Sequence, residues 1–138
     1  MKPFIDTNVL LEHVMQRDNG ELVRKLFIKL SEHNVQYYVS YLTMANAAYI
    51  LKRGKTKDDL QVVMKKVQGY VSILGCSSRQ MKQAIAHSPV RDFEDLLQYQ
   101  CAKDNHCDSI VTFNKKDYYF ADDITILTPE EFIGQLSE

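Results

Sequence analysis

Acidic, amide and hydroxyl residues stand where the apolar segments of this chain end. Acidic side chains that share a site repel one another, and a hard divalent cation relieves that repulsion. Oxygen ligands without His or Cys suit Mg²⁺ or Mn²⁺, which activates water and neutralises charge on a phosphodiester. These residue types therefore point to metal-assisted phosphodiester hydrolysis. The residues are Asp6, Ser40, Asn46, Asp92, Glu94, Asp95, Thr112, Asn114 and Asp117.

Helix capping is the alternative interpretation for several of them. In "FIDTNVLLE", Asp6 lies between an apolar strand end and a helical pattern, where its side chain can bind free N–H groups. The segment "DFED" has the spacing of a capping box, with Asp92 as N-cap and Asp95 at the third helical position. Capping alone is favoured for Asp92, whereas for Asp95 we expect a dual role. Residues that only cap helices should be scattered, whereas residues of a site should collect at strand ends.

Short strand-like segments alternate with helical patterns along the whole sequence. We expect strands at 2–5, 35–40, 70–74, 109–112 and 124–127. We expect helices at 7–16, 19–33, 42–52, 57–69, 78–87, 92–105 and 128–136. This alternation predicts an α/β fold, with a mostly parallel sheet of four to five strands and helices on both faces.

The predicted sheet brings the polar residues to one edge. In parallel sheets, ligands bind beyond the carboxyl ends of the strands. We therefore expect Asp6, Asp95 and Asp117 to converge, with Asn46 and Asn114 at the rim of the same acidic cleft. Lys115 and Lys116 border this cleft, and we expect them to meet a phosphate group.

Size and composition limit the class of protein. The 138 residues suit one domain spanning 1–138, and a chain of this length needs no disulfide or zinc to remain folded. The net charge of −1 argues against nucleic-acid binding through bulk charge, so phosphates must be held by local lysines or a metal. We expect no signal peptide and no membrane span, which makes the cytoplasm the expected location.

Four segments together resemble the PIN-domain superfamily: "FIDTNVLL", "SYLTMANAAYIL", "DFEDLLQYQCA" and "SIVTFNKKDYY". They are most similar to the subgroup with "DFED" and "TxNxxDF" signatures, in the right order over nearly the whole chain. The resemblance implies a three-layer α/β/α sandwich, a Mg²⁺ or Mn²⁺ site and cleavage of single-stranded RNA. Many small bacterial members, of the VapC type, are toxins of toxin–antitoxin pairs. They are usually dimers, inhibited by a cognate antitoxin.

The resemblance also implies roles for individual residues. The metal-binding and catalytic acids of the family fall on Asp6, Asp95 and Asp117. Asn114 matches the polar residue before the last acid, and Thr112 matches the hydroxyl that ends the strand. Both are expected to support the site.

One position departs from the pattern of most active members. They carry Glu six residues after the Ser that ends the second strand, and this chain carries Asn46 there. Asparagine offers a carbonyl oxygen but no charge, so metal affinity should fall. Asp92 or Glu94 is a candidate replacement, and the subgroup itself often has Asn at this position.

Two other functions compete with a metal-dependent ribonuclease. One is a nucleic-acid- or partner-binding PIN domain with a weakened or inactive site, which Asn46 favours. The other is a receiver-like domain, which needs paired acids after the first strand, whereas "FIDTN" supplies one.

A homodimer is also expected from the sequence. Its proposed apolar interface consists of Tyr37, Tyr41, Tyr49 and Ile50.

Overall fold

Five short parallel strands form one sheet in the computed structural model, which describes residues 1–86 and 92–137. The strands are β1 (Pro3–Ile5), β2 (Tyr38–Ser40), β3 (Ser72–Leu74), β4 (Ser109–Val111) and β5 (Thr125–Leu127). Their order is β3-β2-β1-β4-β5, so the chain starts in the middle of the sheet, builds one side and then returns to build the other. The order reverses between β1 and β4, and their carboxyl ends form the crevice where ligands of such sheets bind.

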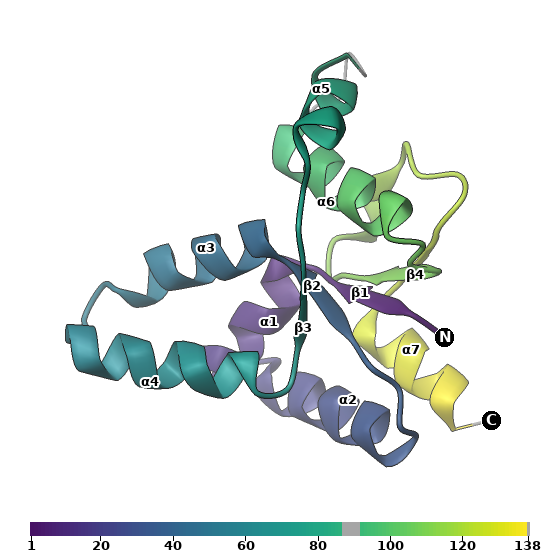
Figure 1. Ribbon diagram of the computed structural model, residues 1–138. Helices are drawn as coiled ribbons and strands as arrows, with labels where there is room; N and C mark the ends of the chain where they lie inside the picture. The colour runs from purple at the N-terminus through teal and green to yellow at the C-terminus, as the bar shows by residue number, and fades with distance from the viewer. Residues whose placement is uncertain (87–91, 138) are drawn as a thin grey trace.

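Helices cover both faces of the sheet (Figure 1). They are α1 (Thr7–Val14), α2 (Gly20–Glu32), α3 (Tyr41–Leu51), α4 (Lys57–Gln68), α5 (Ser78–Ala86), α6 (Phe93–Asp104) and α7 (Pro129–Leu136). Phe4 belongs to the buried cluster with Tyr99 and Ala102 of α6, whereas the next residue, Ile5, belongs to the cluster with α1, α2 and α7. This alternation follows from the two-residue period of a strand. The three-layer α/β/α sandwich expected from the sequence is confirmed.

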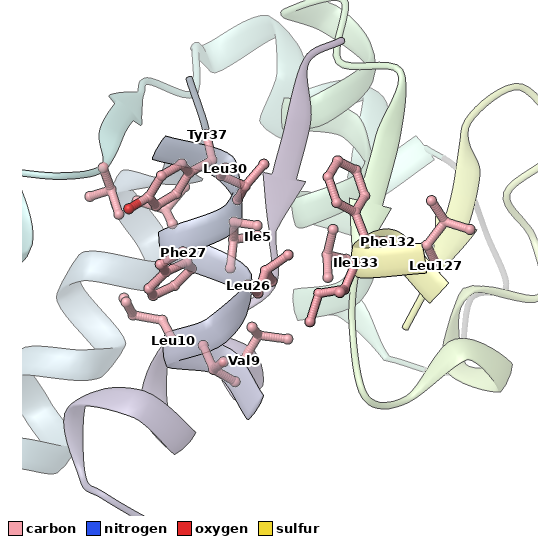
Figure 2. Packing of buried hydrophobic residues seen from close by; sticks show 14 of the residues in the cluster. Ile5, Val9, Leu10, Leu26, Phe27, Leu30, Tyr37, Leu127, Phe132 and Ile133 are labelled. Carbon is pink, nitrogen blue, oxygen red and sulfur yellow. The ribbon is translucent and has the colours of Figure 1, made fainter. Parts of the chain in front are cut away.

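The larger core lies between the sheet and helices α1, α2 and α7. Each fully buried aliphatic or aromatic side chain there contributes about 1.5–3 kcal/mol through burial. Figure 2 shows its members Ile5, Val9, Leu10, Leu26, Phe27, Leu30, Tyr37, Leu127, Phe132 and Ile133. Because Val9 and Leu10 of α1 belong to this cluster, it fixes the amino-terminal end of α1, and therefore Asp6, at the carboxyl end of β1.

Helices α3 and α4 form a hairpin that extends away from the sheet (Figure 1). The turn between them contains Gly54 with φ of +79°, a left-handed conformation that glycine adopts without strain. We call α3, α4 and their turn the arm. Because α3 starts at the end of β2, the arm connects the edge of the sheet to a distant, exposed tip.

The strands and helices expected from the sequence are present, with ends shifted by up to three residues. His87, the last residue of the expected helix 78–87, lies outside the described residues. One short 3₁₀ helix, η1 (Lys115–Tyr118), was not expected. Within the described part of the chain, no helix is both long and apolar enough to cross a membrane.

The prediction of an apolar homodimer surface is wrong for one of its four residues, Tyr37. Tyr37 is 4% exposed, and its ring stacks on Phe27 with 4.8 Å between centroids. Ile50 is half-buried, which leaves Tyr41 and Tyr49 as the exposed members. Tyr37 stabilises the monomer core and is not available to a partner.

Replacing either of two glycines by alanine should change the free energy of unfolding in opposite directions. A Cβ atom on Gly20 would lie 2.9 Å from the carbonyl oxygen of Glu12, whereas one on Gly134 would meet nothing within 4 Å. Gly20→Ala should therefore lower the free energy of unfolding by about 1–3 kcal/mol, as overpacking does. Gly134→Ala should raise it by about 0.5–1 kcal/mol, because alanine favours a helix. Urea unfolding of both variants measures this, and equal effects would contradict the packing of α1 on α2.

Candidate active site at the carboxyl ends of β1 and β4

Asp6 directly follows β1 and is 5% exposed. Its Oδ1 accepts the Thr7 N–H at 2.8 Å, which makes Asp6 the N-cap of α1. Its Oδ2 accepts the Thr112 hydroxyl at 2.9 Å and the Asn8 amide at 3.3 Å. Burial raises the pKa of Asp6, and the bonds from Thr112 and Thr7 oppose that rise. Asp6 is thus a helix cap and also the fixed acid between β1 and β4.

A buried polar network supports Asp6 from α6. The Nε2 of Gln98 donates to the Thr43 hydroxyl at 2.7 Å and the Thr7 hydroxyl at 3.1 Å, and approaches Asp6 Oδ1 at 3.5 Å. Its Oε1 accepts the Ser40 hydroxyl at 2.5 Å. Gln98 is 1% exposed, so one side chain joins the starts of α1 and α3 to α6.

Asp95 lies among the other acids of the site. Burial, followed by the charges of Asp6, Asp92, Asp117 and Glu94 in that order, raises its pKa to about 7. Asp6 at the end of β1 and Asp117 in η1 reach Asp95 from other elements, whereas Asp92 and Glu94 share the start of α6 with it. Four acids therefore repel Asp95 electrostatically, as expected for a crowded acidic cleft.

The structure confirms the N-cap role expected for Asp92, and it also places this residue at the site. Its Oδ1 accepts the N–H groups of Glu94 at 3.0 Å and Asp95 at 3.3 Å, so Asp92 is the N-cap of α6. It also repels Asp95 and lines a cleft of about 550 Å³ together with Lys116, Asp117 and Tyr119. The cap and the rim of the cleft are thus the same residue.

Asn46 meets an acid from another helix. Its Nδ2 donates to Glu94 Oε1 at 2.8 Å. Burial raises the pKa of Glu94, followed by the charges of Asp92 and Asp6, while the Asn46 bond opposes the rise. A carboxylate therefore lies next to position 46, although it belongs to α6.

The segment after β4 places its polar residues differently. The Thr112 hydroxyl is buried and accepts the Asn114 N–H at 3.1 Å, whereas the Asn114 side chain is exposed and caps nothing. Lys115 is turned to α7, where its Nζ lies 3.0 Å from Glu131 Oε1. Lys116 faces the cleft with Asp117. Of the two lysines expected to meet a phosphate, Lys116 is thus the better placed.

The donor set fits a hard divalent cation. All its candidate ligands are oxygen atoms, and the mutual repulsion at Asp95 is what a cation would relieve. Burial, followed by the charges of Asp6 and Asp95, raises the pKa of the nearby Tyr118 hydroxyl. Nevertheless, in the part of the chain described, no three His, Cys, Asp or Glu side chains are already gathered to hold a metal ion. The convergence of Asp6, Asp95 and Asp117 on one ion thus stays a prediction.

Sequence reasoning missed Gln98 and Tyr118. Gln98 stands one turn after Asp95, and this spacing on an otherwise apolar helix face was the available signal. Tyr118 follows Asp117 directly, within the "TFNKKDYY" segment. Their importance depends on packing between elements that are distant in sequence.

A family model of the PIN domain matches residues 2–116. The matched segment contains Asp6, Asn46 and Asp95 and ends one residue before Asp117. A search among curated proteins finds no match to the chain.

Solved structures share this fold. VapBC2 from Rickettsia felis, bound to a DNA fragment from their promoter, is similar with a TM-score of 0.69 and 17% identity, over 93% of this chain and 98% of that one. FitAB bound to the IR36 DNA fragment gives a TM-score of 0.61 at 17% identity, over 92% and 94%. FitAcB from Neisseria gonorrhoeae gives a TM-score of 0.58 at 16% identity, over 93% of this chain and 98% of that one. At these identities the similarity shows the fold.

The raised pKa of Asp95 predicts a pH-dependent stability without metal. The pKa is 3.8 ordinarily and about 7 in the folded chain, so the folded chain holds an extra proton between these values. The free energy of unfolding therefore falls as the pH rises through that window. Asp95→Asn should raise the melting temperature by more at pH 8 than at pH 4, and weaken Mg²⁺ binding. Calorimetry in EDTA and titration with Mg²⁺ measure the two effects.

Asp59→Asn is the matched control, because Asp59 occupies the same third position of α4 but is exposed. That change should lower stability slightly at pH 8, by about 0.3–1 kcal/mol, since it removes a favourable charge at a helix start. If Asp95→Asn behaves like Asp59→Asn, Asp95 acts only on its own helix.

Gln98→Met should destabilise the fold although the side chains are similar in length. It removes the bonds of Gln98 to the buried hydroxyls of Ser40, Thr43 and Thr7, each worth about 0.5–1.5 kcal/mol, and leaves these hydroxyls only the bonds that they make with one another and with the Thr43 N–H. We expect the free energy of unfolding to fall by at least ~2 kcal/mol in urea titrations. Gln100→Met, two residues later and bonded at the surface to Gln83 and Asp104, should change little. Similar values for both would mean that the network contributes nothing.

Proposed function

Because the chain belongs to the PIN-domain family, we propose that it is a metal-dependent ribonuclease that hydrolyses phosphodiester bonds of single-stranded RNA. The observation that carries the proposal is the repulsion at Asp95, where acids from the end of β1, the start of α6 and η1 act on one carboxyl group. Crowded acids are unfavourable without a cation, so their presence together suits a site that binds a cation.

In this proposal, Asp6, Asp95 and Asp117 hold Mg²⁺ or Mn²⁺, which supplies activation of water and neutralisation of phosphate charge. Asp6 is the fixed member, because bonds from Thr7 and Thr112 set its orientation. Lys116 meets a substrate phosphate in the cleft that it lines with Asp117. Asn114 and Thr112 shape the segment that presents Asp117.

We propose that Glu94 replaces the glutamate expected at position 46. The 2.8 Å bond from Asn46 holds the Glu94 carboxylate beside α3. The negative charge that Asn46 lacks is thereby supplied from the neighbouring helix. Asp92 is the weaker candidate, because its Oδ1 is occupied by capping α6.

The biological setting we propose is a cytoplasmic toxin with a cognate antitoxin. Support comes from the similarity to VapBC2 and FitAB, whose structures were solved bound to DNA fragments. A homodimer stays a prediction, and the loss of Tyr37 from its expected interface weakens the basis for it.

The second candidate function is a PIN domain that binds nucleic acid or a protein partner through an inactive site. The neutral Asn46 is the observation that favours it. The absence of cleavage by the wild-type chain, with RNA binding retained, would support this alternative.

The test is cleavage of a panel of single-stranded RNAs with Mg²⁺ or Mn²⁺. Asp6→Asn should abolish cleavage, with a loss beyond the ~10- to 100-fold typical of residues that only orient a ligand. Its fold should persist, because Asn caps a helix about as well as Asp. Asp122→Asn, an exposed acid outside the cleft, should cleave like the wild type. Wild-type rates for a folded Asp6→Asn preparation would refute the nuclease proposal.

Asn46→Glu is the companion variant in the same assay. It sets two carboxylates against each other where Asn46 now donates to Glu94, so metal binding should tighten and cleavage should increase. A decrease in both would show that the bond from Asn46 matters more than the charge.

A further inference from the structure

Positive charge gathers at the tip of the arm. Four of the six residues 52–57 are cationic, in a chain whose net charge is −1. All four are exposed, and within the described residues none forms an ion pair. They are Lys52, Arg53, Lys55 and Lys57.

An exposed aromatic ring lies beside these cations. Tyr49 is 57% exposed, with Lys52 Nζ 4.5 Å and Arg53 Cζ 5.6 Å from its ring centroid. The ring contributes little to the core, and exposed cation–π contacts are worth only about 0.5–1 kcal/mol. Such a ring between cations presents a stacking face for a base, with charges nearby for the adjacent phosphates.

We propose that Tyr49, Lys52 and Arg53 form a binding surface for single-stranded RNA that extends the candidate active site along α3. The choice of RNA as the ligand rests on the proposed function. Asn46 lies on the same helix, one turn before Tyr49 and Ile50, and its bond to Glu94 joins it to the acidic cluster. From Asn46 to Lys52 the axis rises about 9 Å, close to the length of two to three stacked nucleotides.

The chemistry favours a single strand over the other possible occupants. Bases in a duplex are stacked inside and do not offer their faces to Tyr49. A second copy docked by a two-fold axis would bring the same cations face to face, since such an interface pairs one patch with itself. The α3–α4 turn is also exposed, so a flexible strand can reach it from the cleft.

The experiment measures binding without cleavage. Fluorescence anisotropy in EDTA uses the full chain and a labelled single-stranded RNA of about 12 nucleotides, within the usual range of single-strand sites. Tyr49→Ala should weaken binding about 5- to 100-fold, the loss of one stacked base, and Tyr49→Phe should bind like the wild type. Lys52→Ala/Arg53→Ala should weaken binding and reduce the salt slope by about 1.4, or ~0.7 per lost phosphate contact.

Lys25→Ala/Lys82→Ala is the charge-matched control, because both lysines are exposed on other helices. It should bind like the wild type with nearly the same salt slope. Equal weakening by this control, or no effect of Tyr49→Ala, would overturn the proposed surface. So would a wild-type dimer that the arm variants convert to monomers with unchanged RNA affinity, because the surface would then belong to a second copy.

The outcome for the surface is separable from that for the nuclease. If the wild type binds but cleaves no RNA and the arm variants lose binding, the surface stands and the nuclease proposal fails. If the wild type cleaves while the arm variants bind RNA normally, the surface fails and the nuclease proposal stands.

Discussion

The structure depends on keeping one carboxyl group buried at the middle of the sheet. Burial of Asp6 is unfavourable unless its oxygens are hydrogen-bonded. The donors come from the start of α1 and the end of β4, with the Gln98 amide of α6 close by. Each donor requires its own element to be in place, so the satisfaction of one side chain fixes the relative positions of three layers.

The remaining acids depend on a different balance. Asp92 and Asp95 stand in the first turn of α6, and the N-terminus of a helix stabilises negative charge. That stabilisation is weaker than the combined effect of burial and the charges of the neighbouring acids, because the pKa of Asp95 is still raised. Asp6 therefore offers a carboxyl group held in a fixed orientation, and Asp95 offers a carboxyl group whose charge is repelled by its neighbours. A cation site benefits from both.

The alternation of apolar segments was enough to predict the elements and the sheet, because parallel strands and crossover helices leave few other arrangements. The same alternation predicted that Asp6 and Thr112 lie at one edge of the sheet, at the carboxyl ends of β1 and β4. The part played by Gln98 was not predictable, since its partners lie on α1 and α3. Tyr37 and Lys115 show the same limit. The Tyr37 ring is buried because it stacks on Phe27, and the Lys115 side chain points to α7 because it pairs with Glu131.

The strand order also governs when the centre forms during synthesis. The bond between Asp6 and Thr112 joins residues 106 positions apart, and the acid of η1 comes later still. At ~5–20 residues per second, a ribosome needs roughly 5–20 s to make the intervening chain. Throughout that interval β1 has no β4 beside it, and the acids stay apart. A growing chain therefore lacks the assembled centre, which is completed only as the last third of the polypeptide emerges.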